Sequence, residues 1–178
     1  MRNLLGRGLL AVRTDRVPVL LKNLQRSIVI DLSRLRRMAE HILGAMHVEE
    51  AELSIVLVSD RRIRDLNRRY RKKDSATDVL AFPLESESKD PRRLRRRSGR
   101  SLRKAHEQPP RVLGDVVISL ATARRQAQDF GHALHQEVVR LVVHGVLHLL
   151  GYDHERGARE AARMAGQERK VLRMIAAT

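Results

Sequence analysis

Residues 144–154 read His-Gly-Val-Leu-His-Leu-Leu-Gly-Tyr-Asp-His, and they close a long apolar stretch. His144 and His148 are four residues apart, so on an α-helix their imidazoles lie on one face, one turn apart. Gly151 is a residue type that ends helices, because glycine adopts the left-handed conformation at little cost. The chain can then turn back and bring His154 to the same point. This stretch predicts a metal site at the end of a buried helix, with three imidazole ligands and an open fourth position.

The residue after the first histidine indicates which kind of bond the metal site could hydrolyse. Zinc peptidases carry His-Glu-x-x-His, in which the glutamate is the general base, whereas this chain has Gly145 in that place. A metal held by imidazoles can still stabilise charge on a phosphoryl group or lower the pKa of a bound water. The pattern therefore favours metal-assisted hydrolysis of a bond other than a peptide, although it identifies no general base. The alternative is an apolar helix that merely carries histidines, each of which would then need another buried partner.

The composition indicates a polyanionic partner. The formal net charge is +15, and arginine supplies thirty of the 36 basic residues. Arginine suits bidentate recognition of phosphate, so nucleic acid is expected ahead of an acidic membrane. Aromatic residues are too scarce for an RNA-binding module that reads bases on an aromatic platform. The chain has no cysteine, which excludes disulfides and cysteine ligands to a metal. The four aromatic residues are Tyr70, Phe82, Phe130 and Tyr152.

Hydrophobic periodicity predicts alternating strands and helices. Asp31 and Ser59 are placed to cap helices, and β-branched residues dominate the buried strands. The mixed order indicates one α+β domain, with a small sheet of about four strands packed with about five helices. Strands are expected at 17–24, 53–58, 79–82 and 116–119, and helices at 31–46, from 59 through 70, and at 120–129, 133–150 and 157–175.

Two segments fall outside this pattern. Residues 1–16 read as a basic N-terminal extension, which leaves 17–178 as a single catalytic domain. Residues 86–111 read as a mobile basic loop insertion, because 92–104 carries eight basic residues in thirteen and few apolar ones. This loop is either a solvated charge run or a tether for RNA phosphates. No apolar run is long enough to span a bilayer. We therefore expect a cytoplasmic location and no membrane partner.

Three blocks follow one another in this order along the chain: Leu66-Asn67-x-x-Tyr70-Arg71-x-Lys73-Asp74-x-x-Thr77-Asp78-Val79-Leu80-x-Phe82-Pro83, Leu113-Gly114-Asp115-Val116-Val117-Ile118-Ser119, and the histidine stretch 144–154. Together they resemble the YbeY endoribonuclease family of bacterial rRNA maturation factors. The resemblance covers about residues 17–175 apart from the basic loop. That loop is longer and more basic than is typical of the family, and Ala81 replaces the usual serine.

The resemblance implies a small mixed β-sheet with helices and one divalent metal ion, most often taken as Zn²⁺, on His144, His148 and His154. It also implies cleavage of single-stranded RNA in 16S rRNA 3′-end maturation and ribosome quality control. The partners would be precursor 16S rRNA, the small ribosomal subunit and assembly proteins. Arg71 occupies the position of an arginine regarded as functional in the family.

The resemblance, together with the chemistry of the side chains, implies roles for individual residues. Arg71 would bind the phosphoryl oxygens and act with the metal ligand His144 as the catalytic pair. Its alternative is an ordinary surface arginine at the end of a basic helix. Asp115 and Asp153 would orient a metal-bound histidine or merely cap turns. Possible RNA contacts are Arg68, Arg69 and Lys73.

Two other classes compete with the endoribonuclease. One is a non-catalytic RNA-binding ribosome assembly factor with a structural metal, and the other is a metalloprotease, which Gly145 disfavours. A closed site with four protein ligands would favour the assembly factor, and an open site the enzyme. His135 is a conceivable fourth ligand, but it lies nine residues before His144 and on roughly the opposite helix face.

Overall fold

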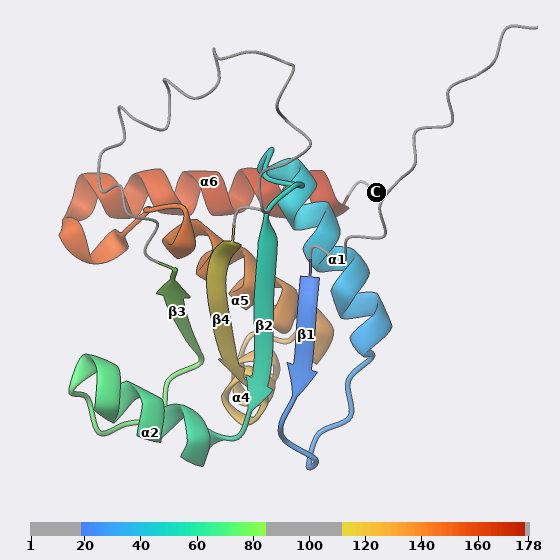
Figure 1. Ribbon diagram of the computed structural model, residues 1–178, viewed down its shortest axis with the longest axis vertical. Coiled ribbons are helices and arrows are strands. Elements are labelled where there is room, and N and C mark those ends of the chain that lie inside the picture. Colours follow the sequence, from blue (N-terminus) through green and yellow to red (C-terminus); the bar gives the residue numbers. More distant parts are fainter. Residues whose placement is uncertain (1–18, 85–111, 177–178) are drawn as a thin grey trace, which may run out of the picture.

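The computed structural model describes residues 19–84 and 112–176. Four strands form one mixed sheet in the order β1-β2-β4-β3 (Figure 1). The first three strands in this order run parallel, and β3 is antiparallel to β4. The expected N-terminal extension 1–16 and the basic loop 86–111 lie outside the described residues. The strands are β1 (Val19–Asn23), β2 (Glu52–Val58), β3 (Val79–Pro83) and β4 (Val112–Ser119).

Five α-helices and one short 3₁₀ helix accompany the sheet in the described part of the chain, so the expected α+β class is confirmed. The predicted caps are present: Asp31 accepts a hydrogen bond from the Arg34 N–H at 2.9 Å, and Ser59 accepts one from the Arg62 N–H at 3.4 Å. The helices are α1 (Leu32–Ala45), α2 (Asp60–Arg71), α4 (Leu120–Asp129), α5 (Leu134–Leu149), η2 (His154–Arg156) and α6 (Ala158–Ala176).

Helix α5 is the centre of the main hydrophobic core. Its apolar side chains are buried almost all round, as expected for a helix enclosed by other elements. It packs against β3 and β4 on one side and against α1 and α6 on the other (Figure 1). A smaller core of Val58, Ile63, Leu80 and Val117 joins the opposite face of the sheet to α2. The two cores set α2 and α5 at fixed places on opposite faces of the sheet.

Gly145 allows α5 to approach the sheet closely. A Cβ atom at this position would lie 2.6 Å from Cγ1 of Val116 on β4, closer than van der Waals contact permits. Any side chain here would push the helix away from the sheet. Packing therefore gives a second reason for glycine, besides the absence of the glutamate that a zinc peptidase would need.

Strand β4 is longer than the sequence indicates. The predicted strand began at residue 116 because Gly114 and Asp115 resemble a turn, but the observed strand begins at Val112. A register irregularity opposite Glu52 and Leu53 absorbs one residue, and Gly114 takes a φ of +135° there. Backbone pairing with β2 and β3 on both sides overrides the local turn preference.

Among the described residues, no helix is both long and apolar enough to cross a membrane.

We predict that Gly145→Ala destabilises the fold by about 1–3 kcal/mol, because the added methyl group overpacks the contact with Val116. Gly166→Ala in α6 is the matched control, since a Cβ there meets no atom within 4 Å. It should leave stability unchanged or raise it by up to about 1 kcal/mol through helix propensity. Urea unfolding followed by circular dichroism measures both. Equal effects of the two substitutions would contradict this account of Gly145.

Candidate metal site

His144 and His148 project from the last two turns of α5. Both side chains are partly buried, and their Nε2 atoms face each other at 3.2 Å. The rings are inclined at 70° with centroids 4.8 Å apart, so they converge on one point without stacking. The helical spacing predicted from the sequence is therefore present in the structure.

A glycine-terminated helix end turns the chain toward the third histidine. Gly151 has a φ of +88°, and its N–H donates to the carbonyl of His148 at 2.9 Å. The N–H of Tyr152 donates to the carbonyl of Leu147 at 3.0 Å, which completes a Schellman motif. Asp153 then caps η2 by accepting a hydrogen bond from the Glu155 N–H at 2.9 Å. These two local motifs place His154, the first residue of η2, beside the other rings.

The three histidines fit a metal ion. One ligand-capable nitrogen from each histidine lies within 4.8 Å of the others. The ring centroid of His154 is 5.3 Å from that of His144 and 5.1 Å from that of His148. Two nitrogens bound about 2.0–2.1 Å from a tetrahedral ion are roughly 3.3 Å apart. The 3.2 Å between the Nε2 atoms of His144 and His148 matches that separation. The cluster is therefore positioned to bind a metal ion.

The environment favours the form of His148 that binds metal. Burial, followed by the neighbouring His144 and His154, lowers the pKa of His148 and favours its neutral imidazole. Among the described residues, the group that could hold a metal contains these three histidines and no fourth side-chain ligand. Catalytic zinc sites hold their metal with three protein ligands and leave a fourth position to water or substrate.

His135 is not close to this cluster. It belongs to the first turn of α5, at the end of the helix far from His148. Burial lowers the pKa of His135. The charged residues that act on this pKa are Arg34 and Asp31, at the start of α1. The structure therefore does not bring His135 to the site as a fourth ligand.

Glu168 of α6 lies next to the cluster. Its Oε2 is 3.7 Å from Nδ1 of His144, and its Oε1 is 3.6 Å from Nε of Arg140. Interaction with the His144 side chain lowers the pKa of Glu168 despite the opposing effect of burial. The lowered pKa favours an ionised carboxylate. This carboxylate is only 18% exposed and lies next to Nδ1 of the first histidine.

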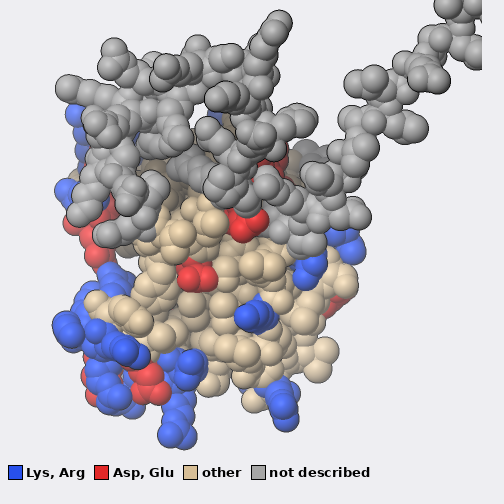
Figure 2. All heavy atoms as spheres, viewed as in Figure 1, with Lys and Arg blue, Asp and Glu red and all other residues tan. Residues whose placement is uncertain are grey.

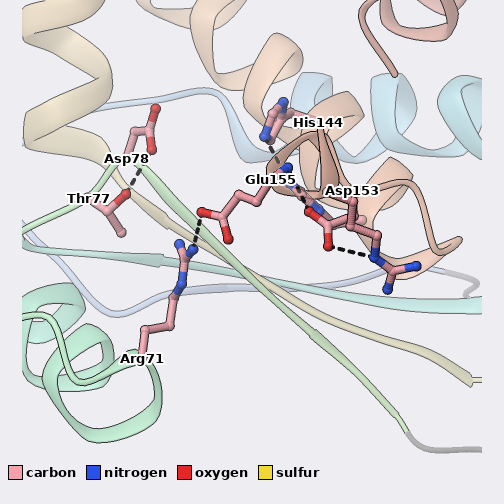
Figure 3. A network of polar contacts seen from close by, with 8 residues as sticks. Arg71, Thr77, Asp78, His144, Asp153 and Glu155 are labelled. Carbon is pink, nitrogen blue, oxygen red and sulfur yellow. Dashed lines mark hydrogen bonds and ion pairs between the residues drawn. The ribbon is translucent and has the colours of Figure 1, made fainter. Parts of the chain in front are cut away.

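Arg71 reaches the site from the other face of the sheet. It ends α2, and its Nη2 donates to Oε1 of Glu155 at 2.6 Å (Figure 3). Glu155 directly follows His154, so this ion pair joins the end of α2 to the segment that carries the third histidine. The guanidinium lowers the pKa of Glu155. The structure therefore brings Arg71, predicted from the sequence to act on a phosphoryl group, into contact with the residue that follows the third histidine.

Polar contacts hold the segment between α2 and β3. The Asn67 side chain donates to the carbonyl of Ser75 at 2.9 Å, and Arg64 binds Asp74 through two hydrogen bonds of 2.9 and 3.0 Å. Burial alone would raise the pKa of Asp78, but hydrogen bonds from the Gln126 side chain, the Val79 N–H and the Thr77 hydroxyl outweigh it and lower that pKa. These contacts, most of them made by residues of the first sequence block, thus fix the place where α2 ends.

The predicted RNA contacts lie at the same end of α2. Arg68 pairs with Asp65 at 3.4 Å, and the guanidinium of Arg69 lies 5.7 Å from the centre of the Tyr70 ring. Lys73 is close enough to Glu155 to help lower the pKa of that carboxylate. Lysine and arginine side chains gather over α2 at the lower left of Figure 2, while much of the adjoining surface is uncharged. The structure thus clusters these cations near Arg71.

The two predicted orienting aspartates lie in different places. Asp153 shapes the turn before His154 and also accepts a hydrogen bond from Nε of Arg156 at 3.0 Å. Asp115 is exposed and pairs with Phe82 on the sheet. It alternates with Val116, which faces α5, so its side chain points to the opposite face. The structure therefore does not bring Asp115 to the histidines. The predicted role took no account of the alternation of side chains along the strand.

Two carboxylates at the site were missed by the sequence analysis. Glu155 follows His154, but only the fold reveals its partner Arg71, 84 positions away. Glu168 does leave a signal in the sequence, because it interrupts the apolar stripe formed by Met164, Val171 and Ile175 on α6. A carboxylate on such a stripe needs a buried partner.

Comparisons with known proteins agree with this architecture. The family model described as endoribonuclease YbeY matches residues 20–176. The chain is 42% identical over 154 residues to endoribonuclease YbeY of Aquifex aeolicus, covering 86% of this chain and 89% of that protein. It is 44% identical over 160 residues to endoribonuclease YbeY of Pelotomaculum thermopropionicum, covering 88% and 95%.

A solved structure shares the fold. The solution structure of TM1509 from Thermotoga maritima aligns with a TM-score of 0.57 and 24% sequence identity, covering 88% of each chain. At this identity the likeness concerns the arrangement of helices and strands.

We predict that His148→Ala abolishes binding of about one zinc ion per chain, because two remaining imidazoles are too few to hold a catalytic zinc site. Elemental analysis after zinc loading and removal of excess metal measures this loss. His135→Ala is the matched control and should retain the metal. Full zinc content in the His148 variant would show that the cluster is not the site.

Proposed function

This chain belongs to the endoribonuclease YbeY family, and we propose that it is a metal-dependent endoribonuclease that cleaves single-stranded RNA. The observation that carries this proposal is the convergence of three imidazoles, with the cation Arg71 paired to the residue that follows the third histidine. We propose Zn²⁺ as the ion, since three histidines with an open position are typical of catalytic zinc. The family name of the relatives supports RNA as the substrate.

The biological task that we propose is maturation of the 16S rRNA 3′ end and ribosome quality control, in the cytoplasm. Its partners would be precursor 16S rRNA, the small ribosomal subunit and assembly proteins. The net charge of +15 supports a polyanionic partner of this kind, because cations that neutralise RNA phosphates release bound counterions.

The residues divide the chemistry between them. A bound metal would supply Lewis-acid stabilisation of charge on the phosphoryl group. His144, His148 and His154 would hold it with their neutral rings. Arg71 would bind non-bridging phosphoryl oxygens, for which its planar guanidinium is suited. Because Arg71 is paired with Glu155, a phosphate must replace or share that carboxylate when RNA binds.

The carboxylates around the site are already engaged. Glu155 binds Arg71, Asp153 accepts hydrogen bonds from the Glu155 N–H and from Arg156, and Glu168 faces His144 and Arg140. A carboxylate bound to a cation has a lowered pKa and is a weak base. This arrangement supports charge stabilisation as the main source of catalysis, and general-base assistance from these three carboxylates as a lesser one.

The competing functions fit the site less well. A structural metal would be expected to have four protein ligands, and the cluster in the described residues offers three. A peptidase would need a glutamate at position 145, where the contact with Val116 leaves no room for a side chain.

We predict that Arg71→Ala lowers the rate constant for cleavage of a single-stranded RNA by about 10²-fold or more, because one positive charge is lost from the transition state. Zinc content and unfolding midpoint should not change. Arg62→Ala, near the other end of α2, is the control and should retain activity. Single-turnover cleavage with zinc-loaded protein measures the rates. A loss as large in the Arg62 variant would mean that Arg71 has no special place in catalysis.

We also predict that Arg69 and Lys73 contact RNA phosphates. Replacing both with alanine should reduce the slope of log Kd against log salt by about 1.4, at roughly 0.7 for each single-strand phosphate contact. Fluorescence anisotropy with a labelled oligonucleotide between low and moderate salt measures the slope. Arg26→Ala with Arg37→Ala removes the same net charge from exposed positions near α1 and should leave the slope nearly unchanged. Equal slopes for the two double variants would place the RNA elsewhere.

A further inference from the structure

Glu168 occupies a core position on a helix whose other core positions are apolar. The buried residues of α6 are Met164, Val171 and Ile175, and Glu168 falls on the same stripe, four residues after the first and three before the second. Its side chain is 18% exposed. A charged group at such a position costs free energy unless it is paired. Its partners should therefore account for its presence.

Both partners of Glu168 lie on one face of α5. Arg140 and His144 are one helical turn apart, and the carboxylate lies between them, 3.6 Å from Nε of Arg140 and 3.7 Å from Nδ1 of His144. Arg140 is 47% exposed, so water can solvate the guanidinium. The His144 ring is partly buried and has one nitrogen toward Glu168 and the other toward His148.

The orientation of the His144 ring decides which nitrogen can bind a metal. Nε2 faces Nε2 of His148 at 3.2 Å, so Nε2 must carry the free electron pair. In a neutral imidazole this requires the proton to be on Nδ1. Glu168 is the carboxylate that lies on the Nδ1 side of the His144 ring.

We propose that Glu168 is a positioning residue for the metal site: its carboxylate accepts a hydrogen bond from the Nδ1–H of His144 and thereby directs Nε2 to the metal. This inference rests on the proposed metal site at His144, His148 and His154. Arg140 holds the carboxylate between the two side chains of α5. The present separation of 3.7 Å is a charge contact. It should shorten to a charge-assisted hydrogen bond of roughly 2.8 Å when metal binds.

The general chemistry of metal sites supports this role. A ligating histidine usually donates its second ring N–H to a carboxylate or a carbonyl, which fixes both the tautomer and the ring orientation. Loss of such a partner typically lowers metal affinity by about 10- to 100-fold. Glu168 would act through His144 without touching the metal or the RNA.

The test compares Glu168→Leu with Glu168→Gln. Leucine suits the apolar stripe, so stability should be kept or increased, while zinc affinity, measured by competition with a chelating dye, should fall by about 10- to 100-fold. Glutamine retains an oxygen that can accept a hydrogen bond from the Nδ1–H and should recover most of that affinity. Long-range ¹H–¹⁵N spectra of the metal-free protein should show His144 protonated on Nδ1 in the wild type and a mixture of tautomers in the leucine variant.

The controls separate the possible failures. Glu160→Leu removes a partly exposed glutamate of the same helix that pairs with Arg163 at 3.5 Å, and it should change neither zinc affinity nor the His144 spectrum. Unchanged zinc affinity and an unchanged tautomer in Glu168→Leu would overturn the role of Glu168 alone. If the wild-type protein bound no zinc, the metal site itself would fail. Loss of stability with unchanged zinc affinity would make Glu168 purely structural.

Discussion

The close packing of α5 on the sheet is the constraint on which the site depends. Gly145 lies against Val116 of β4, and α1 and α6 enclose the helix from the other side. Helix α5 thus has little freedom to shift or rotate, since the interior is close-packed. His144 and His148 inherit this rigidity, because each flanks the buried face of the helix. A ligand pair on a fixed helix keeps its separation before any metal arrives, which reduces the cost of binding.

The electrostatics of the site follow from pairing at several places. The neutral form of His148 is favoured by burial, whereas Asp78, Glu155 and Glu168 are kept ionised by hydrogen bonds or cations. Each of these carboxylates joins two elements: Asp78 connects β3 to α4, Glu155 connects η2 to α2, and Glu168 connects α6 to α5. The charges near the site are therefore part of its architecture as well as of its chemistry.

Local signals in the sequence predicted most of the elements and the histidine cluster. The four-residue spacing of His144 and His148, Gly151 at the helix end, and the caps Asp31 and Ser59 all act within a few residues, so the sequence reveals them directly. The start of β4 was wrong because pairing with β2 and β3 extends the strand through an apparent turn at Gly114. The role expected for Asp115 does not fit the strand. Val116 faces α5, so the side chain of Asp115 points to the other face of the sheet.

The sequence by itself determined the three histidines that cluster, the helix that carries two of them, the turn that returns the third, and the family. These features depend on the periodicity of one helix and on the conformational freedom of one glycine, both of which are properties of neighbouring residues. Only the tertiary structure decided that Arg71 meets Glu155, that Glu168 stands behind His144, and that Gly145 is required by Val116. Such contacts join residues distant in the chain, and their positions are set by the packing of whole helices and strands, which no local pattern encodes.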